Sequence, residues 1–132
     1  MRAILRENLL PAEGLKHREQ DVQVLLHRAS LLDPFDRRVM EAVLDRGMSA
    51  TQIARLVSLS PQRLRYRIRL LSKHLLSKRF VSAMRAIAYL DEDTAEVLRR
   101  HALQLHPVRS VAKELGITVH AVRKRLTLAE GF

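Results

Sequence analysis

The 132-residue sequence contains no cysteine and no tryptophan, and it has only four glycines and four prolines. The absence of cysteine excludes a disulfide framework and a thiolate zinc site. Aromatic residues make up only 4% of the chain, and alternating runs of β-branched residues are missing. Leu, Ala, Val and Arg dominate instead, and this composition favours an all-α fold.

Acidic residues are missing from a long internal stretch. Residues 46–90 contain ten Lys or Arg side chains and no Asp or Glu, whereas the rest of the chain carries 14 of each sign. This stretch therefore supplies the whole net charge of +10, which favours a polyanionic partner such as nucleic acid. No apolar run approaches the roughly 18 residues of a membrane span, so we expect a cytoplasmic, nucleoid-associated protein with no membrane partner.

The centre of the basic stretch, Ser60 to Leu76, has the pattern of an amphipathic helix. Ser60 is suited to the N-cap and Pro61 to the first helical position. An apolar stripe at helical spacing consists of Leu64, Ile68, Leu71 and Leu75. The remaining surface is polar and consists of Gln62, Arg63, Arg65, Tyr66, Arg67, Arg69 and Lys73. We interpret this segment as a DNA-recognition helix, with these polar residues and Ser60 as its DNA-binding candidates.

The polar residues of this helix are expected to divide their roles. Phosphate contacts supply most of the affinity, and contacts to base edges supply the sequence preference. We assign Arg63 and Arg67 to phosphates, and we place the base-facing residues nearer the base edges: Gln62, Arg65, Tyr66 and Arg69. Two alternatives stay open, because the basic face could be merely solvated and Tyr66 could be a half-buried packing residue.

The residues ahead of this helix predict a three-helix unit over 32–76. Asp33 and Pro34 begin one helix and Gly47 ends it, and Ser49 and Gln52 form a capping-box pattern at the start of the next. The last two helices are joined by a short turn, as in a helix-turn-helix motif. Ser58 stands in that turn where the motif usually has glycine, a departure that costs up to about 1 kcal/mol if the position needs a positive φ.

The same pattern returns 58 residues later. Residues 90–126 align with 32–68 without a gap, with apolar, small and capping residues in matching positions. A second helix-turn-helix unit is therefore expected over 90–132, and its polar residues are the DNA-binding candidates Thr118, His120, Arg123, Lys124 and Arg125. Val119 could belong to the core of that unit. We expect residues 77–89 to form a connecting helix between the two tandem units. Residues 1–31 are expected to be an N-terminal helical segment that packs on the first unit or mediates dimerisation.

Two stretches resemble region 4 of the sigma-70 family. The first is LDPFDRRVMEAVLDRGMSATQIARLVSLSPQRL, from Leu32 to Leu64, and the second is GITVHAVRKRL, from Gly116 to Leu126. The resemblance implies a helix-turn-helix fold, of the kind that serves in promoter recognition, in repressors and in the paired DNA-binding modules of transposases. The strand-opening aromatic pattern of sigma region 2 is missing, so a complete sigma factor is not expected.

The sequence thus predicts a sequence-specific regulator that binds double-stranded DNA and has no enzymatic activity. No phosphate-binding loop or nucleophile elbow occurs, and His101 and His106 have no additional ligands for a metal, so we expect no cofactor and no metal site. Two alternatives remain: a module that binds RNA polymerase or a partner regulator, and the DNA-binding subunit of a transposase or recombinase. A homodimer is compatible with all three.

Overall fold

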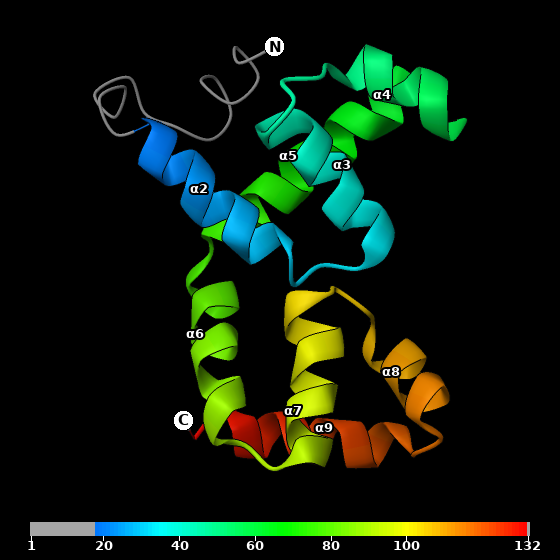
Figure 1. Ribbon diagram of the computed structural model, residues 1–132. Helices are drawn as coiled ribbons and strands as arrows, with labels where there is room; N and C mark the ends of the chain where they lie inside the picture. Colours follow the sequence, from blue (N-terminus) through cyan, green and yellow to red (C-terminus); the bar gives the residue numbers. More distant parts are fainter. Residues whose placement is uncertain (1–17, 132) are drawn as a thin grey trace. The chain divides into compact units, whose positions relative to one another are not determined.

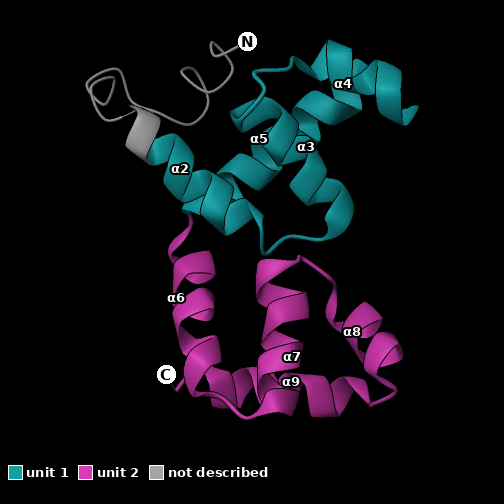
Figure 2. Cartoon of the chain, in the orientation of Figure 1, with its two compact units in different colours: residues 1–76 teal, residues 77–132 magenta. Residues whose placement is uncertain are grey.

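The computed structural model describes residues 18–131, with side chains from residue 21 onward, and this part of the chain is all-α, with no strand (Figure 1). The expected all-α class is confirmed. The chain divides into two compact units, residues 1–76 and residues 77–132, which are coloured separately in Figure 2. The first part of the expected N-terminal segment, ahead of residue 18, lies outside the described residues.

The described part of unit 1, residues 18–76, has four helices around one core. They are α2 (Arg18–Ala29), α3 (Pro34–Leu44), α4 (Ala50–Val57) and α5 (Pro61–Leu76). Helix α2 packs on α3 and α5, and α4 packs on α5. The largest fully buried side chains are Leu25, Met40, Val43, Leu44, Leu64, Leu71 and Leu75. The Arg28 guanidinium also donates a hydrogen bond to the Leu75 carbonyl oxygen at 2.8 Å, which joins the end of α2 to the end of α5. The described part of the N-terminal segment therefore packs on the first unit.

Local capping explains where the helices of unit 1 begin. Pro34 is the first residue of α3, and Asp33 precedes it in an extended conformation without a side-chain cap bond. At α4 the expected capping box is present, since Ser49 Oγ accepts from the Gln52 N–H at 3.2 Å and Gln52 Oε1 accepts from the Ser49 N–H at 3.0 Å. These bonds satisfy two of the free N–H groups at the helix start.

Unit 2 also contains four α-helices and two short helical turns of other types. They are α6 (Lys78–Ala86), the 3₁₀ turn η2 (Ile87–Tyr89), α7 (Glu92–Leu98), the π-helical turn η3 (Arg99–Leu103), α8 (Val108–Leu115) and α9 (Val119–Ala129). Figure 1 shows α9 crossing α7, and these two helices are in contact. Helix α6 packs on η3. The segment expected as a connecting helix is therefore α6 and η2, and it belongs to the second compact unit.

The two units share backbone details at an offset of 58 residues. Each has two residues with positive φ: Gly47 (65°) and Ser58 (57°) in unit 1, and Leu105 (64°) and Gly116 (67°) in unit 2. In each unit, the residue that follows the first positive-φ residue donates its N–H to the carbonyl oxygen six positions earlier in the chain. The distance is 3.0 Å in unit 1 and 2.9 Å in unit 2. In each unit, the second positive-φ residue is the first residue of a three-residue turn between two helices that pack on each other. Each unit thus has glycine at one of the two left-handed positions, and not at the same one.

The same offset also relates α2 to α6. Val22 and Leu25 are buried on α2, and the residues 58 positions later, Phe80 and Ala83, are buried on α6. The internal similarity therefore begins one helix earlier than the aligned stretches 32–68 and 90–126. Within the described residues, four α-helices follow in corresponding order in the two units.

The exchanged glycines allow a reciprocal test of backbone strain. Ser58 is exposed and left-handed, so Ser58→Gly should stabilise unit 1 by up to about 1 kcal/mol. Gly116→Ala should destabilise unit 2 by about 1 kcal/mol for backbone reasons alone, because a Cβ there would meet no atom within 4 Å. Urea unfolding of both variants measures the two effects. Changes of the same sign would contradict the equivalence of the two turns.

Candidate nucleic-acid interface

Helix α5 is set into unit 1 by its apolar stripe. Leu64, Leu71 and Leu75 are fully buried, and Ile68 is 2% exposed, as the periodicity of the sequence predicts. The Arg63 N–H donates to Ser60 Oγ at 3.1 Å, so Ser60 caps the first turn. This cap and this stripe fix where α5 starts and which side faces the core.

The opposite side of α5 is exposed and cationic. We call this surface the outer face of α5, and it consists of Gln62, Arg63, Arg65, Tyr66, Arg69 and Lys73. Tyr66 is 66% exposed, so the alternative of a half-buried packing residue is wrong. No carboxylate of the described residues forms an ion pair with Arg63, Arg65, Arg69 or Lys73. Four cations without ion-pair partners therefore project from one helix.

Arg67 differs from its neighbours and requires a correction. Its guanidinium forms a bidentate pair with Asp36 at the start of α3, with Nε to Oδ1 at 3.0 Å and Nη2 to Oδ2 at 2.6 Å. Asp36 is only 4% exposed, and this hydrogen bond raises the pKa of Arg67 further above its usual value. We call this pair the arginine bridge of unit 1. It assigns Arg67 to the structure of the unit, so the prediction of a phosphate contact for Arg67 is withdrawn.

Helix α9 of unit 2 repeats this arrangement with fewer cations. The Ala121 N–H donates to Thr118 Oγ1 at 3.0 Å, so Thr118 is the N-cap, and Val122 is fully buried. Val119 is half-buried and packs against the core of the unit, as one of the alternatives predicted. The exposed candidates, which we call the outer face of α9, are His120, Arg123 and Lys124.

Arg125 is not part of that outer face. Its Nη1 atom donates to Thr94 Oγ1 at 3.1 Å, and its guanidinium lies 3.5 Å from an Asp91 oxygen and 3.7 Å from an Asp93 oxygen. Thr94 is 2% exposed. It stands 58 positions after Asp36, and Arg125 stands 58 positions after Arg67, so the two contacts join corresponding positions of the two units. This contact is the arginine bridge of unit 2. The prediction that Arg125 binds DNA is therefore withdrawn as well.

The arginine bridges could not be inferred from charge or periodicity. The residue type does not distinguish Arg67 from the exposed arginines near it. A single aspartate in the first turn of a helix is already explained by the helix dipole. The signal that was available is spacing, because arginine follows the buried polar residue by 31 positions in both units.

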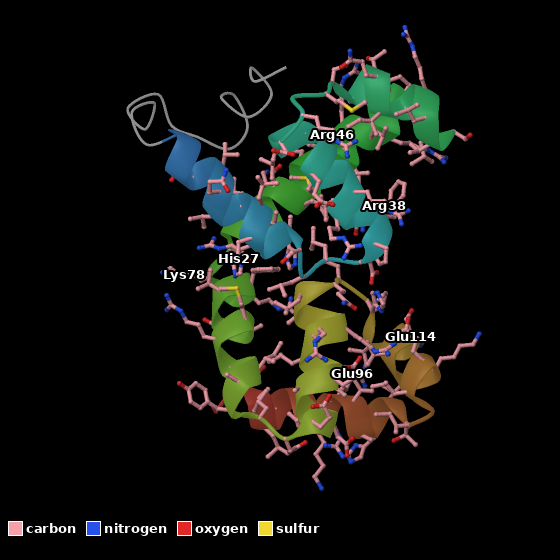
Figure 3. All side chains as sticks on the ribbon, viewed as in Figure 1. His27, Arg38, Arg46, Lys78, Glu96 and Glu114 are labelled. Atoms are coloured by element: carbon pink, nitrogen blue, oxygen red, sulfur yellow. The ribbon has the colours of Figure 1, made fainter. Side chains whose placement is uncertain are left out.

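A network of charged side chains joins α7, η3 and α8 of unit 2. Arg100 contacts Glu96 at 2.7 Å and Glu114 at 3.1 Å, and Glu96 also pairs with Arg99 (Figure 3). His106 Nδ1 lies 2.8 Å from Glu114 Oε1. The hydrogen bond with His106, followed by that from Arg100, lowers the pKa of Glu114, and the hydrogen bond from Arg100 lowers the pKa of Glu96. In unit 2, part of the positive charge is therefore paired with carboxylates, whereas the cations on the outer face of α5 in unit 1 are not.

The described residues contain no group of His, Cys, Asp or Glu side chains that could hold a metal ion. The imidazole of His101 instead contacts Arg79 through Nε2 at 2.9 Å and the carbonyl oxygen of His106 through Nδ1 at 2.9 Å. No helix in the described part of the chain is long and apolar enough to cross a membrane.

The fold of unit 2, with α9 capped at its start and exposed on its outer face, defines this unit as a helix-turn-helix domain. Residues 80–130 match the family model described as sigma-70, region 4, so the resemblance is confirmed for this part of the chain. The match covers less than half of the chain, and it begins within α6, ahead of the aligned stretch at residue 90. It does not include residues 32–68, whose resemblance stays a prediction. No curated protein and no solved structure matches the chain.

The carboxylate network gives unit 2 a predicted pH dependence. A folded-state pKa below the ordinary 4.5 means that Glu96 and Glu114 contribute stability above about pH 4.5, which is lost as the pH falls through the lowered folded values. Glu114→Gln should therefore lower stability at pH 7 and flatten its loss below pH 5, as followed by thermal unfolding. Glu92→Gln, at an exposed carboxylate that forms no ion pair with a described residue, is the matched control and should change the pH profile less than Glu114→Gln does. An unchanged profile in Glu114→Gln would contradict the network.

Proposed function

We propose that the protein is a transcriptional regulator that binds double-stranded DNA sequence-specifically through two tandem helix-turn-helix units of the sigma-70 region 4 type. Helix α5 would be the recognition helix of unit 1 and α9 that of unit 2, each entering a major groove. A cytoplasmic, nucleoid-associated location would follow from DNA binding. The proposal assigns no catalytic reaction to the chain.

The observation that carries the proposal is the outer face of α5. Its four cations lack ion-pair partners in the described part of the chain, and they lie within a stretch of 45 residues that has no acid. When such cations neutralise DNA phosphates, the counterions condensed on the DNA are released. This release favours binding, and the affinity therefore falls as the salt concentration rises. Gln62, Arg65 and Tyr66 on the same face have donors for base edges, and arginine bonded to guanine is the commonest specific contact.

The tandem arrangement is supported by what the two units share. Both place an arginine bridge, a hydroxyl N-cap and a left-handed turn residue at an offset of 58. Shifted by 58 residues, the matched range 80–130 becomes 22–72, which spans nearly all the described part of unit 1. Unit 1 would therefore be a second copy of the region 4 type.

One observation favours a different partner for unit 2. The outer face of α9 has two cations where that of α5 has four, and Asp91, Glu92 and Asp93 are exposed at the start of α7. A unit with mixed charges of this kind suits a protein surface better than a phosphate backbone. In this second candidate, unit 1 binds DNA while unit 2 binds RNA polymerase or a partner regulator. The DNA-binding subunit of a transposase or recombinase is the remaining alternative.

The roles of the α5 side chains can be separated by selection of bound duplexes from a random pool, followed by mobility shifts at two salt concentrations. Arg65→Ala should cost about 1–3 kcal/mol on the selected sequence and relax the preference at one base pair. Arg63→Ala should weaken all sequences alike and reduce the logarithmic salt slope by about 1.

Arg38→Ala is the matched control, because it removes an exposed charge of the same kind from α3 of the same unit. It should leave the sequence preference intact and change the salt slope less than Arg63→Ala does. Failure to enrich any sequence, together with DNA titrations that do not depend on salt, would favour the protein-interaction module. Enrichment of terminal repeat sequences would favour the recombination subunit.

A further inference from the structure

Unit 2 contains a cavity that lies entirely within its own helices. Its volume is about 460 Å³, which is within the range of small-molecule sites. Helices α6, α7 and α9 and the turn η3 contribute its walls. The apolar part of the lining consists of Ala83, Ala86, Leu98, Ala102, Leu126 and Ala129. Four of these six residues are alanines, so the cavity is wide because its wall residues are small.

The corresponding place in unit 1 is filled. At the offset of 58, Ala83 corresponds to Leu25, Ala102 to Leu44 and Ala129 to Leu71. These three leucines are among the largest fully buried side chains of unit 1, with 1%, 1% and 0% of their surface exposed. The cavity of unit 2 thus lies beside alanines at three positions where unit 1 has buried leucines. Truncating three core leucines would strongly destabilise a domain unless something else occupied the space.

Four polar side chains accompany the alanines in the lining: Arg79, Ser82, His101 and Glu130. Because His101 Nδ1 contacts a carbonyl oxygen at 2.9 Å, that nitrogen carries the proton, and Nε2 is left to accept from the Arg79 guanidinium at 2.9 Å. His101 therefore holds the Arg79 guanidinium at the cavity. The remaining N–H groups of Arg79 have no carboxylate partner among the described residues.

Glu130 lines the same cavity and forms no ion pair with Arg79 or with another described cation. Two opposite charges thus flank one apolar space without neutralising each other. Both side chains are exposed, so each can pair with a charged group of a ligand, and a ligand with only one charged group pairs with only one of them. A zwitterion with an apolar body satisfies both charges and the alanine-lined space.

We propose that unit 2 binds a small zwitterion of the amino-acid class that has an aliphatic or aromatic side chain. The Arg79 guanidinium receives the carboxylate, Glu130 receives the ammonium group, and the side chain fills the space beside Ala83, Ala102 and Ala129. Because α6 and α9 both line the cavity, the ligand fastens α9, the proposed recognition helix of unit 2, to α6. This site is independent of the proposed DNA binding, since its occupancy is measured without DNA.

The test is calorimetric titration and thermal unfolding of the full chain with L-leucine and with L-phenylalanine. At least one should raise the unfolding midpoint by an amount that grows with its concentration. The analogues 4-methylpentanoate and isopentylamine, which each lack one charged group of leucine, should bind at least about tenfold more weakly. Equal binding of leucine and either analogue, or no binding of any probe, would overturn the proposal.

Two kinds of variant test the site itself. Ala102→Leu and, separately, Ala83→Leu install the residue that unit 1 has at the same position, and each should abolish binding of the amino acid while the chain stays folded by circular dichroism. Arg79→Gln should weaken binding at least about tenfold. Asp21, the residue of unit 1 that corresponds to Arg79, supplies the control variant Asp21→Asn, which should bind normally. Retained binding in a folded Ala102→Leu or Ala83→Leu variant would place the ligand elsewhere and overturn the proposal.

Discussion

Arg67 reaches from α5 to the buried carboxylate of Asp36 on α3, and this bridge, together with the buried apolar stripe, fixes which side of α5 faces the core. A buried aspartate is costly without a cation, and an arginine fork satisfies both of its oxygens at once. In unit 2 the hydroxyl of Thr94 takes the place of the carboxylate, and Arg125 reaches it from α9. With one arginine turned inward in each unit, the residues on the opposite side must face solvent.

The two units use this common frame differently. Unit 1 has a solid leucine core and a cationic outer face on α5, which are the features that binding to a phosphate backbone requires. Unit 2 compensates much of its positive charge with Glu96 and Glu114, and it replaces three core leucines by alanines around a cavity. Two units with a similar order of helices but different surfaces and cores are consistent with different roles. In the proposed roles, unit 1 binds a polyanion and unit 2 responds to a partner or ligand.

The sequence was informative where one residue acts through its local geometry. Ser60 and Thr118 as caps and the buried stripe from Leu64 to Leu75 were predicted from spacing and residue type, and Ser58 was identified as the turn residue that would be strained if its φ were positive. Contacts between distant positions could not be predicted in this way. The inward direction of Arg67 and Arg125 and the packing of α6 on η3 depend on which helices meet. The cavity became visible only when burial could be compared between corresponding residues of the two units.

The arginine bridge of unit 1 is tested most directly by a double-mutant cycle on the free energy of unfolding of the full chain, with Asp36→Ala, Arg67→Ala and the combination. Arg67 is partly exposed, so solvent screens part of the attraction, and the expected coupling energy is about 1–3 kcal/mol. The double variant should then be nearly as stable as the worse single variant. Additive effects, with a coupling energy near zero, would contradict the account that this contact holds α5 in place.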